Sequence, residues 1–174
     1  MALWGITDAD EAKPKWLTTA QKKEVFANNS GWVVEAGSTQ TGNDNTDAQP
    51  EVLCCVGDLA TGIGAADITE IEFITTAFDK SDGGNIDVRV RFNEQVTVNT
   101  SGGTPTLTIT NDTPSRNLTA TYLSGSTTNE LIFRKTIAAA NAATNAGDVL
   151  SIAANAMALA SGTIKDLSLI HISE

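Results

Sequence analysis

Apolar and polar residues alternate along much of the chain from residue 68 onward. Between Ile86 and Phe92 every second residue is apolar, and the residues between them are Asp or Arg. Similar alternation occurs at 106–110, 118–122 and 131–134, and turn-forming residues separate these segments at 79–84 and 124–128. Successive side chains of a strand point to opposite faces of a sheet, so this pattern indicates half-buried strands. Short strands at this spacing are typical of a β-sandwich.

The first 64 residues follow a different pattern. Thr18 and Gln21 have the spacing of a capping box, which predicts a short helix running to about Ala27 and ending at the turn 28–31. Short apolar runs at 32–36 and 52–56 predict strands, and a Gly/Asn/Asp/Thr-rich loop (37–50) lies between them. Residues 57–67 have the composition of a linker. We therefore expect an extended N-terminal arm with one short helix over residues 1–64, a β-sandwich over 65–166, and a separate tail over 167–174.

Composition and charge exclude several classes of protein. The 174 residues carry a formal net charge of −10, from 21 acidic and 11 basic side chains. This acidity argues against binding to nucleic acid, which requires a basic face. The apolar runs are too short for a membrane span, and the first residues do not have the pattern of a signal peptide. We expect a protein that is made in the cytoplasm and binds neither membrane nor nucleic acid.

Side chains suited to catalysis are scarce. His171 is the one histidine, and the two cysteines, Cys54 and Cys55, are adjacent. Nucleophile–base pairs and transition-metal sites usually need several such residues, so we expect no enzyme activity, no catalytic residue and no cofactor. Neighbours in a strand point to opposite faces, so we expect one thiol to be more buried than the other and no disulfide between them.

Residues 86–166 resemble a family of bacterial immunoglobulin-like repeats found in large surface and secreted proteins. The matching segments are Val88-Arg-Val-Arg-Phe-Asn-Glu-Gln-Val, Gly103-Thr-Pro-Thr-Leu-Thr-Ile, Leu118-Thr-Ala-Thr-Tyr-Leu-Ser-Gly-Ser, Asn129-Glu-Leu-Ile-Phe, Leu150-Ser-Ile-Ala-Ala-Asn-Ala-Met-Ala-Leu and Ser161-Gly-Thr-Ile-Lys-Asp. The resemblance implies a mainly β, immunoglobulin-like sandwich that acts as a binding or spacer module. It carries over no catalytic residues.

The N-terminal segments are similar to the openings of virion structural proteins of marine tailed phages, especially those that infect cyanobacteria. These segments are Met1-Ala-Leu-Trp-Gly, Lys13-Pro-Lys-Trp-Leu-Thr and Gly31-Trp-Val-Val-Glu-Ala-Gly. The resemblance implies a place on the surface of a phage particle. The ending Leu167-Ser-Leu-Ile-His-Ile-Ser-Glu departs from both families. It looks like translated sequencing adaptor, and a genuine apolar final strand is the alternative, so we assign no role to His171.

The N-terminal arm holds the candidate partner-binding residues. All three tryptophans and a cluster of lysines lie in it, and buried aromatic side chains are the usual hot spots of interfaces. The candidates are Trp4, Lys13, Lys15, Trp16, Lys22, Lys23, Phe26 and Trp32. The alternatives are that the tryptophans form a small core of their own and that the lysines are a solvated helix face.

The turn at 79–84 holds weak candidates for a calcium site. Asp79, Asp82 and the nearby Asp87 could supply oxygen ligands to Ca²⁺. The spacing of these acids does not match a known calcium loop, and Asp and Gly are favoured in turns for conformational reasons. A plain turn is therefore the preferred interpretation, and we expect no metal.

Together these observations predict a virion structural protein, specifically a capsid decoration protein. The arm would bind the major capsid protein, another virion protein or a neighbouring copy, and the sandwich would project outward, with weak contact to a host surface or glycan. The alternatives are a tail-, neck- or fibre-associated virion protein, or a fragment of a bacterial surface adhesin. The adhesin is less favoured because the chain contains no second copy of the repeat.

Overall fold

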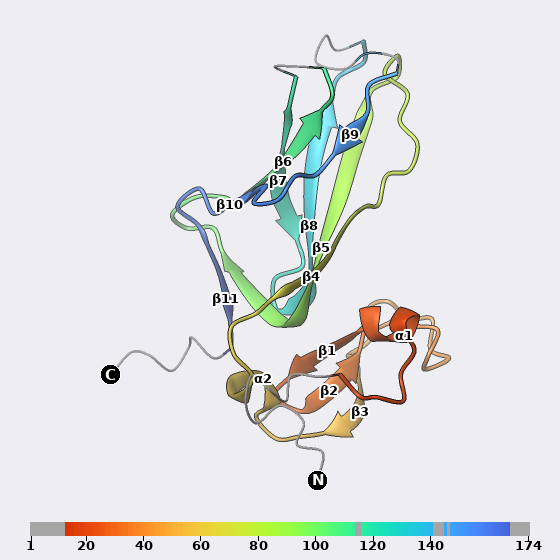
Figure 1. Ribbon diagram of the computed structural model, residues 1–174, viewed down its shortest axis with the longest axis vertical. Coiled ribbons are helices and arrows are strands. Elements are labelled where there is room, and N and C mark those ends of the chain that lie inside the picture. Colours follow the sequence, from red (N-terminus) through yellow and green to blue (C-terminus); the bar gives the residue numbers. More distant parts are fainter. Residues whose placement is uncertain (1–12, 114–115, 141–144, 146, 168–174) are drawn as a thin grey trace.

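The computed structural model describes residues 13–113, 116–140, 145 and 147–167. These residues form mainly β-strands, which confirms the fold class predicted from the alternation of apolar and polar residues. Figure 1 shows a sandwich-like body of strands, formed by residues 65–166, above a smaller N-terminal region, formed by residues 13–64. Trp4 and His171 lie outside the described residues.

The N-terminal region contains two short helices and three strands. In chain order they are α1 (Thr19–Lys23), β1 (Val25–Asn28), β2 (Gly31–Val34), β3 (Glu51–Cys55) and α2 (Leu59–Gly62). The capping box is confirmed: the Gln21 backbone N–H donates to the Thr18 hydroxyl, and the Thr18 N–H donates to the Gln21 side chain. The expected continuation of the helix to Ala27 is wrong, because Val25–Asn28 instead pairs with β2 in an antiparallel hairpin.

The N-terminal region has a hydrophobic core of its own. Trp32 is fully buried in a cluster that also contains Leu17, Val25, Ala27, Val34, Leu59, Ala60 and Ile63. The predicted linker 57–67 contains α2. This helix supplies Leu59 and Ala60 to the core, and Ile63 follows directly after it. The region is therefore a small folded unit and more structured than the extended arm that we expected. In β3, Cys54 is half-buried and Cys55 is exposed, as expected, and neither forms a disulfide.

The sandwich is built around one long strand. Its strands are β4 (Ile68–Phe73), β5 (Gly84–Asn99), β6 (Thr106–Asn111), β7 (Leu118–Ser124), β8 (Thr128–Ile137), β9 (Leu150–Ser151), β10 (Met157–Ala158) and β11 (Thr163–Asp166). The first part of β5 lies between β4 and β8, and its last residues pair with β11. The pairing of β5 with β8 is interrupted between Arg91 and Val96. The interruption marks the point where the N-terminal region meets the sandwich.

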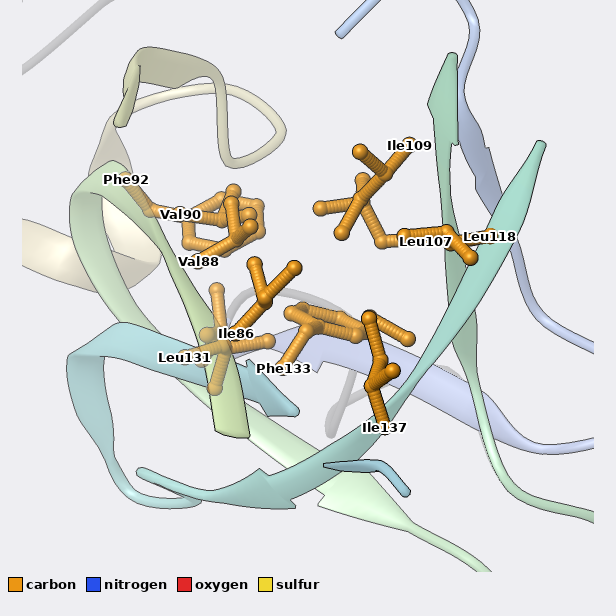
Figure 2. Packing of buried hydrophobic residues seen from close by; sticks show 12 residues of the cluster. Ile86, Val88, Val90, Phe92, Leu107, Ile109, Leu118, Leu131, Phe133 and Ile137 are labelled. Carbon is orange, nitrogen blue, oxygen red and sulfur yellow. The ribbon is translucent and has the colours of Figure 1, made fainter. Parts of the chain in front are cut away.

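The core of the sandwich lies between β5 and β8 on one side and β6 and β7 on the other. Figure 2 shows the side chains of these strands converging, with Phe133 and Leu131 of β8 facing Leu107 and Ile109 of β6. Residues at alternate positions of β5, from Ile86 to Phe92, are buried in this cluster. The period-two pattern therefore identified the buried face of the strand correctly.

A buried junction joins the two parts of the molecule. Ala27 of β1 pairs in parallel with Glu94 of β5, and Glu94 is fully buried. Phe26 and Val33 project from the face of the β1–β2 hairpin opposite its own core, and both are buried. The connection between the parts is also held in place. The Asp67 N–H donates to the Asn93 side chain at 2.8 Å, and the Ala66 N–H donates to Asp166 at 3.1 Å.

Candidate functional site

Trp16 is a candidate partner-binding residue that the fold presents at the surface. Its side chain is 60% exposed, although it lies between two buried residues, Pro14 and Leu17. The Leu17 N–H donates to the Pro14 carbonyl at 3.2 Å, which closes the turn, and Leu17 packs in the core of the N-terminal region. The fold therefore holds a large aromatic side chain at the surface on an anchored turn.

Phe26 and Trp32 are not available to a partner in this fold. Their exposed fractions are 2% and 0%. Trp32 packs against α2 and the neighbouring strands, so for this residue the alternative of a small separate core is correct. Phe26 lies in β1, which the sequence interpretation had placed in a helix, and that error hid its burial. Trp32 lies in a strand, as expected, and its burial depends on α2.

The lysines do not form one solvent-facing patch. Lys15 is exposed beside Trp16, whereas Lys23 forms an ion pair with Glu70 of β4. The Lys13 ammonium donates to the Lys22 carbonyl at 2.6 Å. Burial lowers the pKa of Lys13 to about 8, and the nearby Glu35 carboxyl opposes part of this shift. The cluster therefore divides between an exposed Lys15 and lysines that contact other parts of the chain.

Two of the three candidate calcium ligands, Asp79 and Asp87, accept hydrogen bonds from other groups of the chain. Asp87 accepts two hydrogen bonds from the guanidinium of Arg134, at 2.7 and 2.6 Å, and this pairing lowers the pKa of Asp87. Asp79 accepts from the Ser81 N–H at 2.7 Å, as expected in a plain turn, and Asp82 is exposed. Within the part of the chain that the structure describes, no three His, Cys, Asp or Glu side chains gather in a way that could hold a metal ion.

A charge cluster at the junction was not predicted from the sequence. Its centre is Arg91 of β5, whose side chain is only 9% exposed. The guanidinium lies 2.9 Å from a carboxylate oxygen of Glu70 and also pairs closely with Glu130 of β8. Its distances to Glu72 and Glu35 are both 3.6 Å. Burial opposes the positive charge of Arg91, but these carboxylates outweigh burial and raise its pKa.

Arg89 extends the cluster along the outer face of β5. Its Nε donates to Glu72 at 2.8 Å, and its Nη1 lies 3.4 Å from Glu130. Residues 89 and 91 both lie on the face of β5 opposite Val88, Val90 and Phe92, whose side chains pack in the core. The cluster thus continues from β4 across β5 to β8.

Glu35 brings the N-terminal region into this cluster. It follows β2, and its side chain accepts a hydrogen bond from the Asn129 amide at 2.8 Å. Burial raises the pKa of Glu35 to about 7, and the nearby Glu130 carboxylate adds to the shift. The Asn129 hydrogen bond and Arg91 act in the opposite direction without cancelling it. Glu35 is therefore a carboxyl group that titrates near neutral pH.

A groove of about 790 Å³ opens beside these residues. Glu35, Arg91 and Glu130 line it, together with Phe26 and the polar side chains of the loop 37–50 and the turn 127–129. The groove combines hydroxyl, amide, carboxylate and guanidinium groups. It lies where the outer face of β5 and β8 meets the N-terminal region.

The sequence pattern could have predicted the charge pairs between β4 and β5, but it could not have predicted the position of Glu35. The outward positions of β4 and β5 hold Glu70 and Glu72 on one strand and Arg89 and Arg91 on the other. Antiparallel pairing of these two predicted strands would have brought the opposite charges together. Glu35 lies far from β8 along the chain, and no local pattern could have placed it beside Asn129 and Glu130.

Comparison with known proteins adds no assignment. The chain matches no protein-family model, no curated protein and no solved structure. No helix among the described residues is both long and apolar enough to cross a membrane.

Proposed function

We propose that this chain is a structural protein of a phage virion, specifically a capsid decoration protein. The N-terminal region binds the shell, and the immunoglobulin-like sandwich is displayed outward. The virion setting rests on the resemblance of the N-terminal segments to phage structural proteins. The single observation that carries the binding role is Trp16, which is 60% exposed on a turn fixed by buried neighbours.

The anchored turn lowers the entropic cost of covering Trp16 with a partner. A tryptophan on an anchored turn loses little conformational freedom when a partner covers it, so most of its apolar area contributes to affinity. Exposed Lys15 beside it adds a charge that favours an acidic partner surface. Many copies on a symmetric shell would then make individually weak contacts strong in combination.

Mass spectrometry of particles purified from the virus that carries this gene tests the location. A decoration protein should be present at hundreds of copies, in a fixed ratio to the major capsid protein. A few to tens of copies would instead indicate a tail-, neck- or fibre-associated protein. Absence from the particles would contradict the proposal.

Replacing the exposed tryptophan tests the surface. Trp16→Ala should lower the affinity for stripped particles by about 30-fold or more, as expected for a hot-spot residue costing about 2 kcal/mol. Leu123→Ala on the sandwich is the matched control, because Leu123 is also an exposed apolar residue, at 48%. Circular dichroism should show both variants folded. Equal affinity of Trp16→Ala and wild type would show that binding uses another surface.

A further inference from the structure

Glu35 has the least charge compensation of the carboxylates around Arg91. That guanidinium is shared among Glu35, Glu70, Glu72 and Glu130, and it lies closer to Glu70 and Glu130 than to Glu35. Glu70 also pairs with Lys23, and Arg89 supports Glu72 and Glu130. The close partner of Glu35 is the Asn129 side-chain amide, which is neutral. An ionised Glu35 would therefore add negative charge beside Glu130, and Arg91 and the Lys13 ammonium balance that charge only in part.

The position of Glu35 makes its charge act between the two parts of the molecule. It belongs to the N-terminal region, whereas Arg91, Asn129 and Glu130 belong to β5 and β8 of the sandwich. Its backbone is fixed, because its N–H donates to the Glu24 carbonyl at 2.8 Å and its carbonyl accepts from the Ser38 N–H at 3.3 Å. The fixed backbone therefore keeps the carboxyl within reach of Glu130 while β2 stays in place.

The groove gives protons access to this carboxyl. Glu35 and Glu130 both line it, and the Glu35 side chain keeps 16% of its surface exposed. The proton can therefore exchange with solvent while the junction stays assembled.

We propose that the junction is a pH-sensitive clamp, which is closed while Glu35 is protonated and loosens when Glu35 ionises. The neutral carboxyl keeps its hydrogen bond to Asn129 and adds no charge to the carboxylates around Arg91. The ionised carboxyl is both desolvated and repelled by Glu130. Ionisation therefore favours a form in which β2 moves away from β8 and water reaches both carboxylates.

The direction of the pH dependence follows from the pKa of Glu35. The pKa is about 7 in the closed junction, against 4.5 for a solvated glutamate. A raised carboxyl pKa means that closure is most favourable below 4.5, weakens as the pH rises, and reaches its limit above 7. The difference between the two values corresponds to an opening constant that increases by up to about 300-fold.

The other charged groups around Glu35 affect how closure of the junction depends on pH above about 7. Lys13 of the N-terminal region has its pKa lowered to about 8, so its buried ammonium disfavours closure below that pH and ceases to do so above it. Charged groups also face Glu35 or Lys13 from β4, β5, β8 and the first helix, namely Glu70, Arg89, Arg91, Glu130 and Lys22. The junction should therefore be loosest between about pH 7 and 8, where Glu35 and Lys13 are both ionised.

Hydrogen–deuterium exchange on the full chain tests the clamp. After correction for intrinsic exchange rates, amides of β1 and of residues 128–131 should become less protected between pH 5.5 and 7.5, whereas those of β6 and β7 should not. Glu35→Gln keeps a hydrogen-bonding partner for Asn129 and should abolish this dependence. Glu51→Gln, at an exposed carboxylate of β3, is the control and should behave as wild type.

Two outcomes would overturn the proposal. One is a Glu35→Gln variant that is folded by circular dichroism and retains the wild-type pH dependence. The other does not depend on any variant: carboxyl-carbon NMR of the wild-type chain should give Glu35 a titration midpoint near 7, and a midpoint near 4.5 would exclude the clamp.

Discussion

Arg91 and Arg134 are both outward-facing arginines with carboxylate partners, but they differ in depth. The Arg91 side chain is 9% exposed and joins carboxylates from several elements. Arg134 is 37% exposed and pairs with Asp87 on the neighbouring strand. Water screens exposed ion pairs strongly, whereas a buried charge that loses its partner keeps its full desolvation cost. The same chemical pair should therefore matter differently at the two sites.

The comparison gives a prediction at the scale of single residues. Arg91→Gln should lower the free energy of unfolding by about 3–5 kcal/mol, because Glu70 and Glu130 lose the buried cation that they share. Arg134→Gln should cause a clearly smaller loss. Urea unfolding of both variants at pH 6 measures the difference. Equal losses would show that burial does not set the strength of these ion pairs.

At the scale of elements, local signals predicted some boundaries correctly and others not. The capping box located the start of α1, because Thr18 and Gln21 satisfy each other's backbone groups without help from the rest of the chain. The end of the helix was misplaced, because Val25–Asn28 takes its conformation from pairing with β2 and from burial against α2. Tertiary contacts of this kind override helix propensity, and a single sequence does not display them.

The candidate site could be predicted from the sequence only where it depends on local contacts. The exposure of Trp16 depends on a local turn, whereas the burial of Trp32 depends on α2, which looked like part of a linker. Composition placed all three tryptophans in one region but could not separate an exposed side chain from a core side chain. The period-two pattern worked best for β5, because each of its faces has a consistent environment along the first half of the strand.

The β1–β2 turn supports a prediction at this scale. Gly31 has a φ of 128°, and a Cβ there would overlap the Cys54 carbonyl oxygen and lie 2.5 Å from the Val56 nitrogen. Gly31→Ala should therefore separate β2 from β3 and cost more than about 2 kcal/mol. Gly42→Ala is the matched control, because Gly42 also has a positive φ (71°) but nothing lies within 4 Å of the added Cβ. Thermal unfolding should rank Gly31→Ala well below Gly42→Ala in Tm, and the reverse order would contradict the packing described at β2.

At the scale of the whole molecule, the buried junction predicts that the two parts unfold together. Unfolding the N-terminal region would expose the apolar side chains of Phe26 and Val33, so each part loses stability when the other is absent. Tryptophan fluorescence reports on the N-terminal region, because Trp16 and Trp32 lie in it and residues 65–166 contain no tryptophan. Far-UV circular dichroism reports mainly on the strands of the sandwich. At pH 6 the two signals should change at the same temperature.

A core substitution strengthens this test. Leu59→Ala removes a side chain that is 1% exposed in the N-terminal core, and it should cost about 2–5 kcal/mol. If the parts are coupled, both signals should shift to the same lower temperature. A shift in fluorescence alone would show that the sandwich folds independently of the N-terminal region.

Among the described residues, the N-terminal region contacts only one end of the sandwich, so the two ends differ in their tolerance of added sequence. The turn 124–128 includes Thr127 and Thr128, which line the groove, so extra residues there would press against the N-terminal region. The turn 79–83 precedes β5 at the end of the sandwich farther from that region (Figure 1). Variation in loop length can therefore accumulate in the turn 79–83. Added residues there would extend the surface at the far end of the sandwich and leave the contact between the two parts unchanged.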